Sequence, residues 1–220
     1  MPDQFSVSKK NKVRQLREYA AYDRDTVFRI LDASLVAQVG FVQDGSAVVV
    51  PMIYGREDAT LFLHGARKAR VVRLLQENGE VCVNVTLVDG LVFARSAFNS
   101  SMRYRSATVF GAARLLESTE DKLNAMRVIS EHSMPGRWGE LRAPLEREIK
   151  MTGVIALDIS TASAKEASGM PDDEDDDYDI PVWAGVLPLK ATYGTLIDDE
   201  RLLPDVKPSQ AVTSLQDRSS

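Results

Sequence analysis

The stretch at residues 34–65 reads SLVAQVGFVQDGSAVVVPMIYGREDATLFLHG and contains three runs of strand-forming residues. Val, Ile, Leu and aromatic side chains dominate these runs, whereas QDG and REDA between them have the composition of hairpin turns. Strands joined by such short turns pair antiparallel. Pro51 interrupts the middle run, and because proline cannot donate to a strand ladder, a sheet edge, a bulge or a ligand is expected beside it.

Downstream of this stretch the strands continue. Residues 80–99 have the pattern of a second hairpin with Asp89-Gly90 at its turn, and residues 104–118 that of a long strand bent at Gly111. A further strand is predicted over 151–160.

Three helices are inserted among the strands. Their predicted boundaries are a start after Asp23 or Asp25, a segment over 67–77 ended by Asn78-Gly79, and a start after Ser118 or Thr119.

This order of elements favours one fold class. Regular strand–helix alternation is missing, which excludes a doubly wound parallel sheet. We predict a mainly β (α+β) fold, a small antiparallel barrel with a few flanking helices. Such a barrel has little room inside for a flavin-sized ligand, so any ligand is expected in an outer groove or at a subunit contact.

Length and composition indicate a single domain. A chain of 220 residues with 44% hydrophobic content can bury one sizeable core. We place that domain at 23–203, after an N-terminal extension at 1–22 and before a flexible tail at 204–220. Residues 160–179, rich first in small polar and then in acidic residues, are predicted to form a mobile surface loop.

Charge and cysteine content narrow the function classes. Seven carboxylates lie within 172–179, so that removing them from the formal net charge of −5 leaves +2 for the remaining chain. A nearly neutral body predicts no nucleic-acid partner. Cys82 is the single cysteine, which excludes an internal disulfide. With no signal peptide or bilayer-spanning stretch in the sequence, we expect a cytoplasmic protein that does not enter a membrane.

The junction between the third run and the following helix, LHGARKAR at 63–70, concentrates three cations. Arg67, Lys68 and Arg70 are predicted to lie in the first helical turn, where the helix dipole disfavours positive charge. A bound phosphate would explain the arrangement, and side chains splayed into solvent are the alternative. His64 lies beside the junction, and no metal-ligand spacing accompanies it, so no metal site is predicted.

Three segments together resemble the pyridoxamine 5′-phosphate oxidase-like, FMN-binding split-barrel superfamily. They are ARKARVVRLL after a strand, YRSATVFGAARLL on a later strand and VWAGVLPLKATYG near the C-terminus. The branch of flavin-nucleotide-binding and nitroimidazole-resistance proteins is the most similar. The resemblance implies a split β-barrel, FMN as cofactor and a homodimer with the flavin at the subunit interface.

The resemblance also implies roles for individual residues. Arg67 and Lys68 match the pair that grips the FMN phosphate, and His64 matches a histidine near the active centre, which makes it the candidate catalytic residue. The other implied cofactor-binding residues are Val50, Pro51 and Met52 along the flavin ring, Arg105 and Ser106 from the second subunit, and Trp183 as a C-terminal aromatic.

The implied activity is an FMN-dependent oxidoreductase acting on a small molecule, similar to a nitroreductase. Ala66 replaces the serine that precedes the Arg-Lys pair in the true oxidases, and no arginine occurs in WAGVLPLKATYG, so pyridoxamine phosphate is not the expected substrate. The alternative is a flavin-binding or sensing module without fast turnover, or a binder of haem or a deazaflavin in the same fold.

Overall fold

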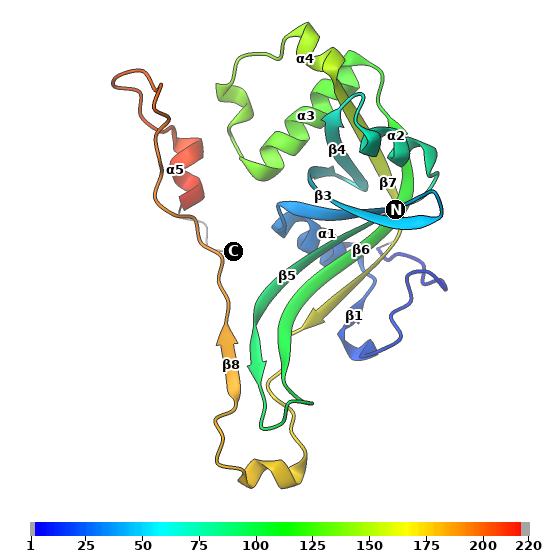
Figure 1. Ribbon diagram of the computed structural model, residues 1–220, viewed down its shortest axis with the longest axis vertical. Coiled ribbons are helices and arrows are strands. Elements are labelled where there is room, and N and C mark those ends of the chain that lie inside the picture. The colour runs from blue at the N-terminus through cyan, green and yellow to red at the C-terminus, as the bar shows by residue number, and fades with distance from the viewer. Residues whose placement is uncertain (1–2, 217–220) are drawn as a thin grey trace.

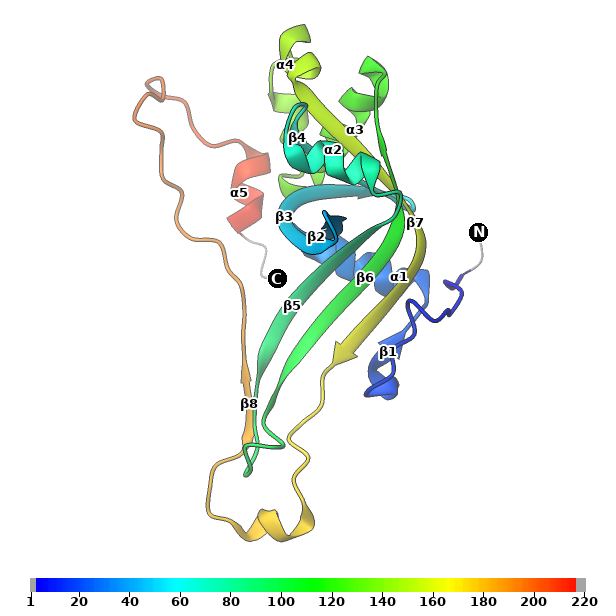
Figure 2. The same cartoon turned by 45° about the vertical axis from the view of Figure 1, so that its right-hand side comes forward.

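The computed structural model describes residues 3–216, and Figures 1 and 2 show its course. The outermost residues of the predicted extension (1–2) and tail (217–220) lie outside the described residues. The strands are β1 (Ala20–Ala21), β2 (Val36–Gln43), β3 (Ser46–Glu57), β4 (Thr60–Ala66), β5 (Val81–Phe93), β6 (Ser101–Leu115), β7 (Thr152–Ala167) and β8 (Gly185–Pro188). The helices are α1 (Arg24–Ala33), α2 (Arg70–Glu77), α3 (Thr119–Ser133), α4 (Glu146–Met151) and α5 (Gln210–Gln216), with short 3₁₀ turns η1 (Arg17–Tyr19), η2 (Trp138–Glu140) and η3 (Asp175–Asp179).

The strands form an antiparallel sheet that closes on itself. Their order is β1-β7-β4-β3-β2-β5-β6, and β6 pairs again with β7. The six long strands therefore make a ring, and the predicted antiparallel fold with flanking helices is confirmed. Beyond the ring, β5, β6 and β7 continue as a long arm, against whose edge β8 pairs (Figures 1 and 2).

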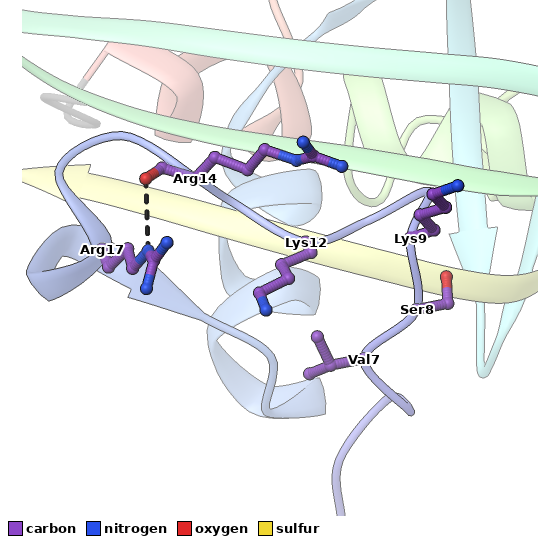
Figure 3. Close-up of a pocket in the computed structure, with 6 residues that line it drawn as sticks. All are labelled: Val7, Ser8, Lys9, Lys12, Arg14 and Arg17. Carbon is purple, nitrogen blue, oxygen red and sulfur yellow. Dashed lines mark hydrogen bonds between the residues drawn. The ribbon is translucent and has the colours of Figure 1, made fainter.

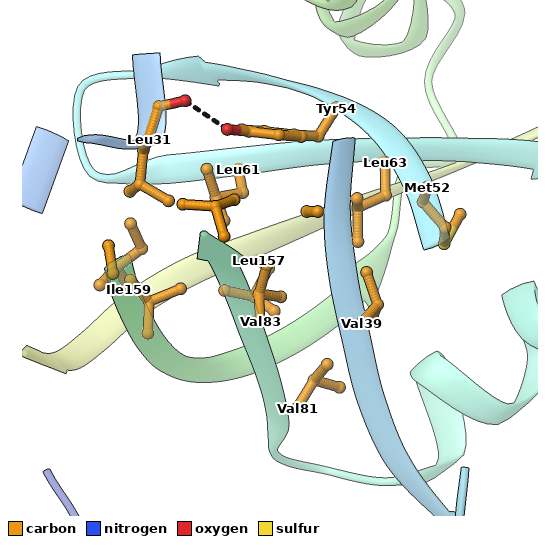
Figure 4. Close-up of a cluster of buried hydrophobic side chains, with 14 of the residues drawn as sticks. Leu31, Val39, Met52, Tyr54, Leu61, Leu63, Val81, Val83, Leu157 and Ile159 are labelled. Carbon is orange, nitrogen blue, oxygen red and sulfur yellow. Dashed lines mark hydrogen bonds between the residues drawn. The ribbon is translucent and has the colours of Figure 1, made fainter. Parts of the chain in front are cut away.

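The main core fills the inside of the ring. Leu61, Leu63, Val83 and Leu157 are completely buried there, as Figure 4 shows. Tyr54 is also fully buried, and its hydroxyl donates a hydrogen bond to the carbonyl of Leu31 in α1. Burial removes the Tyr54 hydroxyl from water, and this hydrogen bond replaces the lost contact with solvent.

A second core lies between the ring and α3. Phe62 points out of the ring, opposite to its neighbours in β4, and packs with Val128 and Ile129 of α3. Because β4 is buried on both faces at residues 61–63, its sequence LFL there is continuously apolar rather than alternating. The predicted caps are confirmed at two helices, since the side chains of Asp23 and Ser118 accept hydrogen bonds from backbone N–H groups of α1 and α3.

The predicted hairpin at Asp89-Gly90 is wrong. β5 is one continuous strand from Val81 to Phe93, with a bulge between Val88 and Gly90. Pairing with β6 along its whole length, and with β8 beyond the bulge, keeps the chain extended where its local composition favours a turn. The predicted bend at Gly111 is confirmed as the register shift between β6 and β7.

The predicted loop at 160–179 is shorter than expected. Residues 160–167 belong to β7, because β6 supplies hydrogen-bonding partners up to Ala167. Asp173, in the acidic run, is buried and accepts hydrogen bonds from the backbone N–H and the guanidinium of Arg95. Within the tail predicted at 204–220, α5 forms, and Ser209 next to it donates to Glu140 at 2.7 Å. No helix in the described range combines the length and apolar character that crossing a membrane requires.

Candidate functional site

The basic junction is a tight turn between β4 and α2. Arg67 N–H donates to the carbonyl of Met151 at 2.8 Å, and Ala69 N–H donates to that of Ala66 at 2.7 Å. The helix begins at Arg70, so Arg67 and Lys68 precede the helix instead of lying in its first turn. The prediction of three cations within the first turn is therefore correct for Arg70 alone.

The N-terminus of α2 leaves its backbone donors open. Ala69 at the cap position provides no side-chain acceptor, and the first turn contains no acidic residue. Uncapped N–H groups and the helix dipole attract an anion. In the described chain, Lys68 and Arg70 make no side-chain ion pair, whereas Arg67 pairs with Glu117 at 2.8 Å. The junction thus carries more positive charge than its own carboxylates neutralise.

A fourth cation, which the sequence prediction missed, lies beside this turn. Lys122 of α3 is only 3% exposed, and its ammonium donates to the carbonyl of Thr152 at 3.3 Å. Thr152 is the cross-strand partner of Ala66, which directly precedes Arg67. A buried ammonium with one carbonyl acceptor and no ion-paired carboxylate among the described residues retains capacity for an anion. The sequence signal for this burial is the helical spacing of Lys122 with Ala125 and Ile129, which places the lysine on the apolar face of α3.

His64 lies half-buried near the end of β4. Its backbone pairs with Val154 of β7, and its side chain projects to the same face as Phe62. Burial lowers the pKa of the imidazole, which keeps the ring neutral at neutral pH. No hydrogen bond holds this ring within the described structure. The other histidine, His132, donates from Nε2 to the carbonyl of Ser34 at 2.7 Å, so its ring is already committed.

The β3 residues Val50, Pro51 and Met52 lie where β3 has an open edge. They pair with β2 on one side, whereas β4 pairs with β3 only from Tyr54 onward. This is the sheet edge predicted from Pro51. Met52 is buried in the main core, and Pro51 is exposed. The open edge offers backbone groups to a bound molecule.

The other predicted site residues lie on the arm. Arg105 of β6 is held by Asp89 through two hydrogen bonds of 2.7 and 2.8 Å, which raise the pKa of the guanidinium. Ser106 follows it and pairs with Thr86 of β5. Trp183 precedes β8, is 67% exposed and packs on Phe93 with ring centroids 5.7 Å apart.

Within one chain, the predicted site residues at the junction and those on the arm lie far apart. Figures 1 and 2 show β8, next to Trp183, and α2, next to Lys68, at opposite ends of the molecule. The junction, His64 and the open edge of β3 form the candidate site of one chain. Among the described residues no group of three or more His, Cys, Asp and Glu side chains is arranged to hold a metal ion.

Known proteins are similar to this chain over most of its length. The family model described as pyridoxamine 5′-phosphate oxidase matches residues 23–166. The flavocytochrome Anf3 from Azotobacter vinelandii is 35% identical, with a TM-score of 0.89 over 94% of this chain and 97% of that one. An FAD and haem binding protein from Mycobacterium smegmatis is 34% identical, with a TM-score of 0.86 over 90% and 97%.

A candidate 5-nitroimidazole antibiotic resistance protein from Bacteroides thetaiotaomicron is similar to a smaller part of this chain. It is 25% identical, with a TM-score of 0.59 over 66% of this chain and 85% of that one. No curated protein sequence matches the chain. The family match, the closed antiparallel ring and these relatives together show that the chain belongs to the pyridoxamine 5′-phosphate oxidase-like split-barrel family.

Proposed function

We propose that this protein is an oxidoreductase that binds FAD and haem. The observation that carries the proposal is the identity of 34–35% with a flavocytochrome and with an FAD and haem binding protein, over 90% or more of the chain. FAD replaces the FMN expected from the sequence because one of these two relatives binds FAD. When bound, the flavin supplies hydride and single-electron chemistry, and the haem supplies single-electron chemistry.

The basic junction fits the diphosphate group of FAD. Arg67, Lys68 and Arg70 lie at the uncapped start of α2, and Lys122 lies against Thr152, the cross-strand partner of Ala66. Glu117 is the one carboxylate paired with these cations in the described structure. Phosphate oxygens accept hydrogen bonds from these cations and from the open N–H groups at once. The chain here binds and orients the cofactor, and the open edge of β3 at 50–52 is the expected neighbour of the flavin ring.

His64 is the residue that fits a haem iron. Iron coordination needs the lone pair of a neutral imidazole nitrogen, and burial of His64 favours that form. The His64 ring makes no hydrogen bond in the described structure, whereas Nε2 of His132 is hydrogen-bonded to the carbonyl of Ser34. This role takes the place of the catalytic role that the family resemblance implied for His64.

We also propose that the protein is a homodimer. Arg105, Ser106 and Trp183 are expected to reach a flavin only from a second chain, since they lie on the arm. The segment between β8 and α5 supports an intermolecular role, because it runs extended and carries exposed apolar side chains (Figure 1). The most exposed of these are Ile197 and Leu203, at 95% and 72%. Apolar surface of this kind is typical of protein interfaces.

The test is the cofactor content of the purified full chain after incubation with FAD and haemin. We expect a flavin spectrum together with a haem Soret band, and FAD as the nucleotide released on denaturation. The variant His64→Ala should lose the Soret band and keep the flavin, whereas His132→Gln, checked for an unchanged melting temperature, should keep both. Protein that takes up neither pigment would refute the proposal.

Reduction of the same sample separates an enzyme from a storage or sensing protein. Bleaching of the flavin by NAD(P)H, followed by reoxidation with a small acceptor, is the result expected of an oxidoreductase. Bleaching that only dithionite achieves would contradict direct turnover with a nicotinamide donor.

A further inference from the structure

A basic cavity lies in the N-terminal extension, away from the junction that precedes α2. Its volume is about 510 Å³, and Figure 3 shows its lining. Four of the six lining residues are cationic, and none is acidic. The lining consists of Val7, Ser8, Lys9, Lys12, Arg14 and Arg17. Cavities of this size hold small organic molecules rather than single ions.

The loop that carries these cations is held in a defined shape. Asn11, only 3% exposed, donates through Nδ2 to the carbonyls of Ser6 and Ala162, at 3.0 and 2.8 Å. Its Oδ1 accepts hydrogen bonds from the backbone N–H and the hydroxyl of Ser8. Phe5 is buried in the main core at the start of the loop. The cations therefore project from an anchored loop, so less ordering entropy is lost when a ligand binds.

The chain then turns back on itself at the far side of the cavity. Leu16 has a φ of 52°, a left-handed conformation that a leucine adopts only under constraint. After this turn the guanidinium Nε of Arg17 donates to the carbonyl of Arg14 at 3.2 Å (Figure 3). The turn thus places the two arginines around the same cavity.

The positive charge of the cavity is not neutralised within the described chain. None of Lys9, Lys12, Arg14 and Arg17 forms an ion pair there. The neighbouring Lys10 does not line the cavity, and it is paired with Glu80 and lies over the ring of Phe110. Four like charges around one cavity repel one another, and a multiply charged anion removes that repulsion.

We propose that this cavity binds the diphosphate group of a nucleotide. Two linked phosphates carry enough negative charge for four cations and more oxygen acceptors than a single phosphate. The cavity also has room beyond the two phosphates for part of a sugar, next to Val7. The inference goes beyond the proposed function, in which the diphosphate of FAD binds at Arg67 and Lys68.

The test is calorimetric titration of ADP into the full chain freed of flavin, at low ionic strength, so that the cavity is open whichever molecule fills it. We expect ADP to bind about tenfold or more tightly than AMP, with affinity that falls as salt is added. The variant Lys9→Gln/Lys12→Gln/Arg14→Gln should weaken ADP binding about tenfold or more. The charge-matched control Arg73→Gln/Arg147→Gln/Lys150→Gln changes exposed cations elsewhere and should leave ADP affinity unchanged.

Separate variants distinguish a failure of the ADP site from a failure of the flavin site. The variant Arg67→Gln/Lys68→Gln should bind flavin about 100-fold more weakly and still bind ADP, so a failure at one site does not imply failure at the other. If the triple variant does not fold, the single variant Lys12→Gln should still weaken ADP binding measurably. No ADP binding by the wild type, or an equal loss in the charge-matched control, would overturn the proposal.

Titration of FAD into flavin-free protein identifies the source of the diphosphate. An unchanged FAD affinity in the N-terminal triple variant would assign the cavity to a separate nucleotide. A loss of FAD affinity that parallels the loss for ADP would place the single diphosphate of FAD in this cavity and would contradict its assignment to Arg67 and Lys68.

Discussion

At the scale of single residues, the candidate site is a place where cations exceed their carboxylate partners. Arg67 and Lys68 were recognisable in the sequence because they lie between a strand and a helix without an acidic neighbour. Lys122 is 55 positions away from Arg67 along the chain and reaches the same turn only through the packing of α3 on β7. The site therefore combines a local sequence signal with a contact that only the fold provides.

Replacing Arg67 and Lys68 together by Gln should weaken flavin binding. Each charge-assisted hydrogen bond contributes about 1.5–3 kcal/mol, and the lower value applies because the Arg67 side chain is 41% exposed. We expect a loss of about 3 kcal/mol, or about 100-fold in Kd, measured by quenching of flavin fluorescence. The control Arg73→Gln removes an exposed cation of α2 and should leave Kd unchanged. Equal affinities of the double variant and the wild type would contradict the phosphate assignment.

At the scale of elements, the position of α3 depends on a close approach to β3. A Cβ atom added at Gly55 would lie 2.7 Å from backbone atoms of Val128 and Ile129. Backbone atoms of a packed helix cannot move aside as a flexible side chain can. The same helix carries Lys122, whose ammonium donates to the carbonyl of Thr152 beside the junction.

The variant Gly55→Ala should therefore be destabilised by the forced displacement of α3. We expect the free energy of unfolding to fall by about 2–3 kcal/mol, measured by chemical denaturation. Gly139→Ala is the matched control, since a Cβ at Gly139 has no atom within 4 Å, and its effect should stay below about 0.5 kcal/mol. A Gly55 variant as stable as this control would show that α3 is not held against β3 as described.

At the scale of the whole molecule, the chain is incomplete as a binding unit under the proposed function. The predicted flavin-binding residues divide between the junction end and the arm, and the apolar segment before α5 is exposed. Two copies in which the arm of each reaches the junction of the other would bring both groups to one flavin. A stable interface of this kind buries about 800 Å² on each partner.

Charged substitutions on that segment should dissociate the proposed dimer. The variant Ile197→Asp/Leu203→Asp is expected to run as a monomer in light scattering after gel filtration and to bind flavin about tenfold more weakly or worse. Val7→Asp/Leu16→Asp changes two exposed apolar residues of the N-terminal extension and should remain dimeric. A wild-type monomer that binds flavin tightly would rule out the shared site.

The sequence by itself determined the local features of this protein. Strand and turn composition at 34–65 predicted antiparallel pairing, and the cations at 67–70 marked the junction. Cap residues narrowed one helix start to Asp23 or Asp25 and another to Ser118 or Thr119, and the structure has the first of each pair. Such features depend on residues close together in the chain, so their periodicity and capping chemistry can be recognised without a structure.

Only the tertiary structure decided the features that depend on distant partners. Asp89-Gly90 became a bulge because β6 and β8 hold β5 extended, and residues 160–167 became strand because β6 pairs with them. The burial of Lys122 and the anchoring of the N-terminal loop through Asn11 to the carbonyl of Ala162 likewise depend on contacts between distant segments. Hydrogen bonds and packing between remote segments contribute more free energy than local turn preference, and local composition does not show which segments will meet.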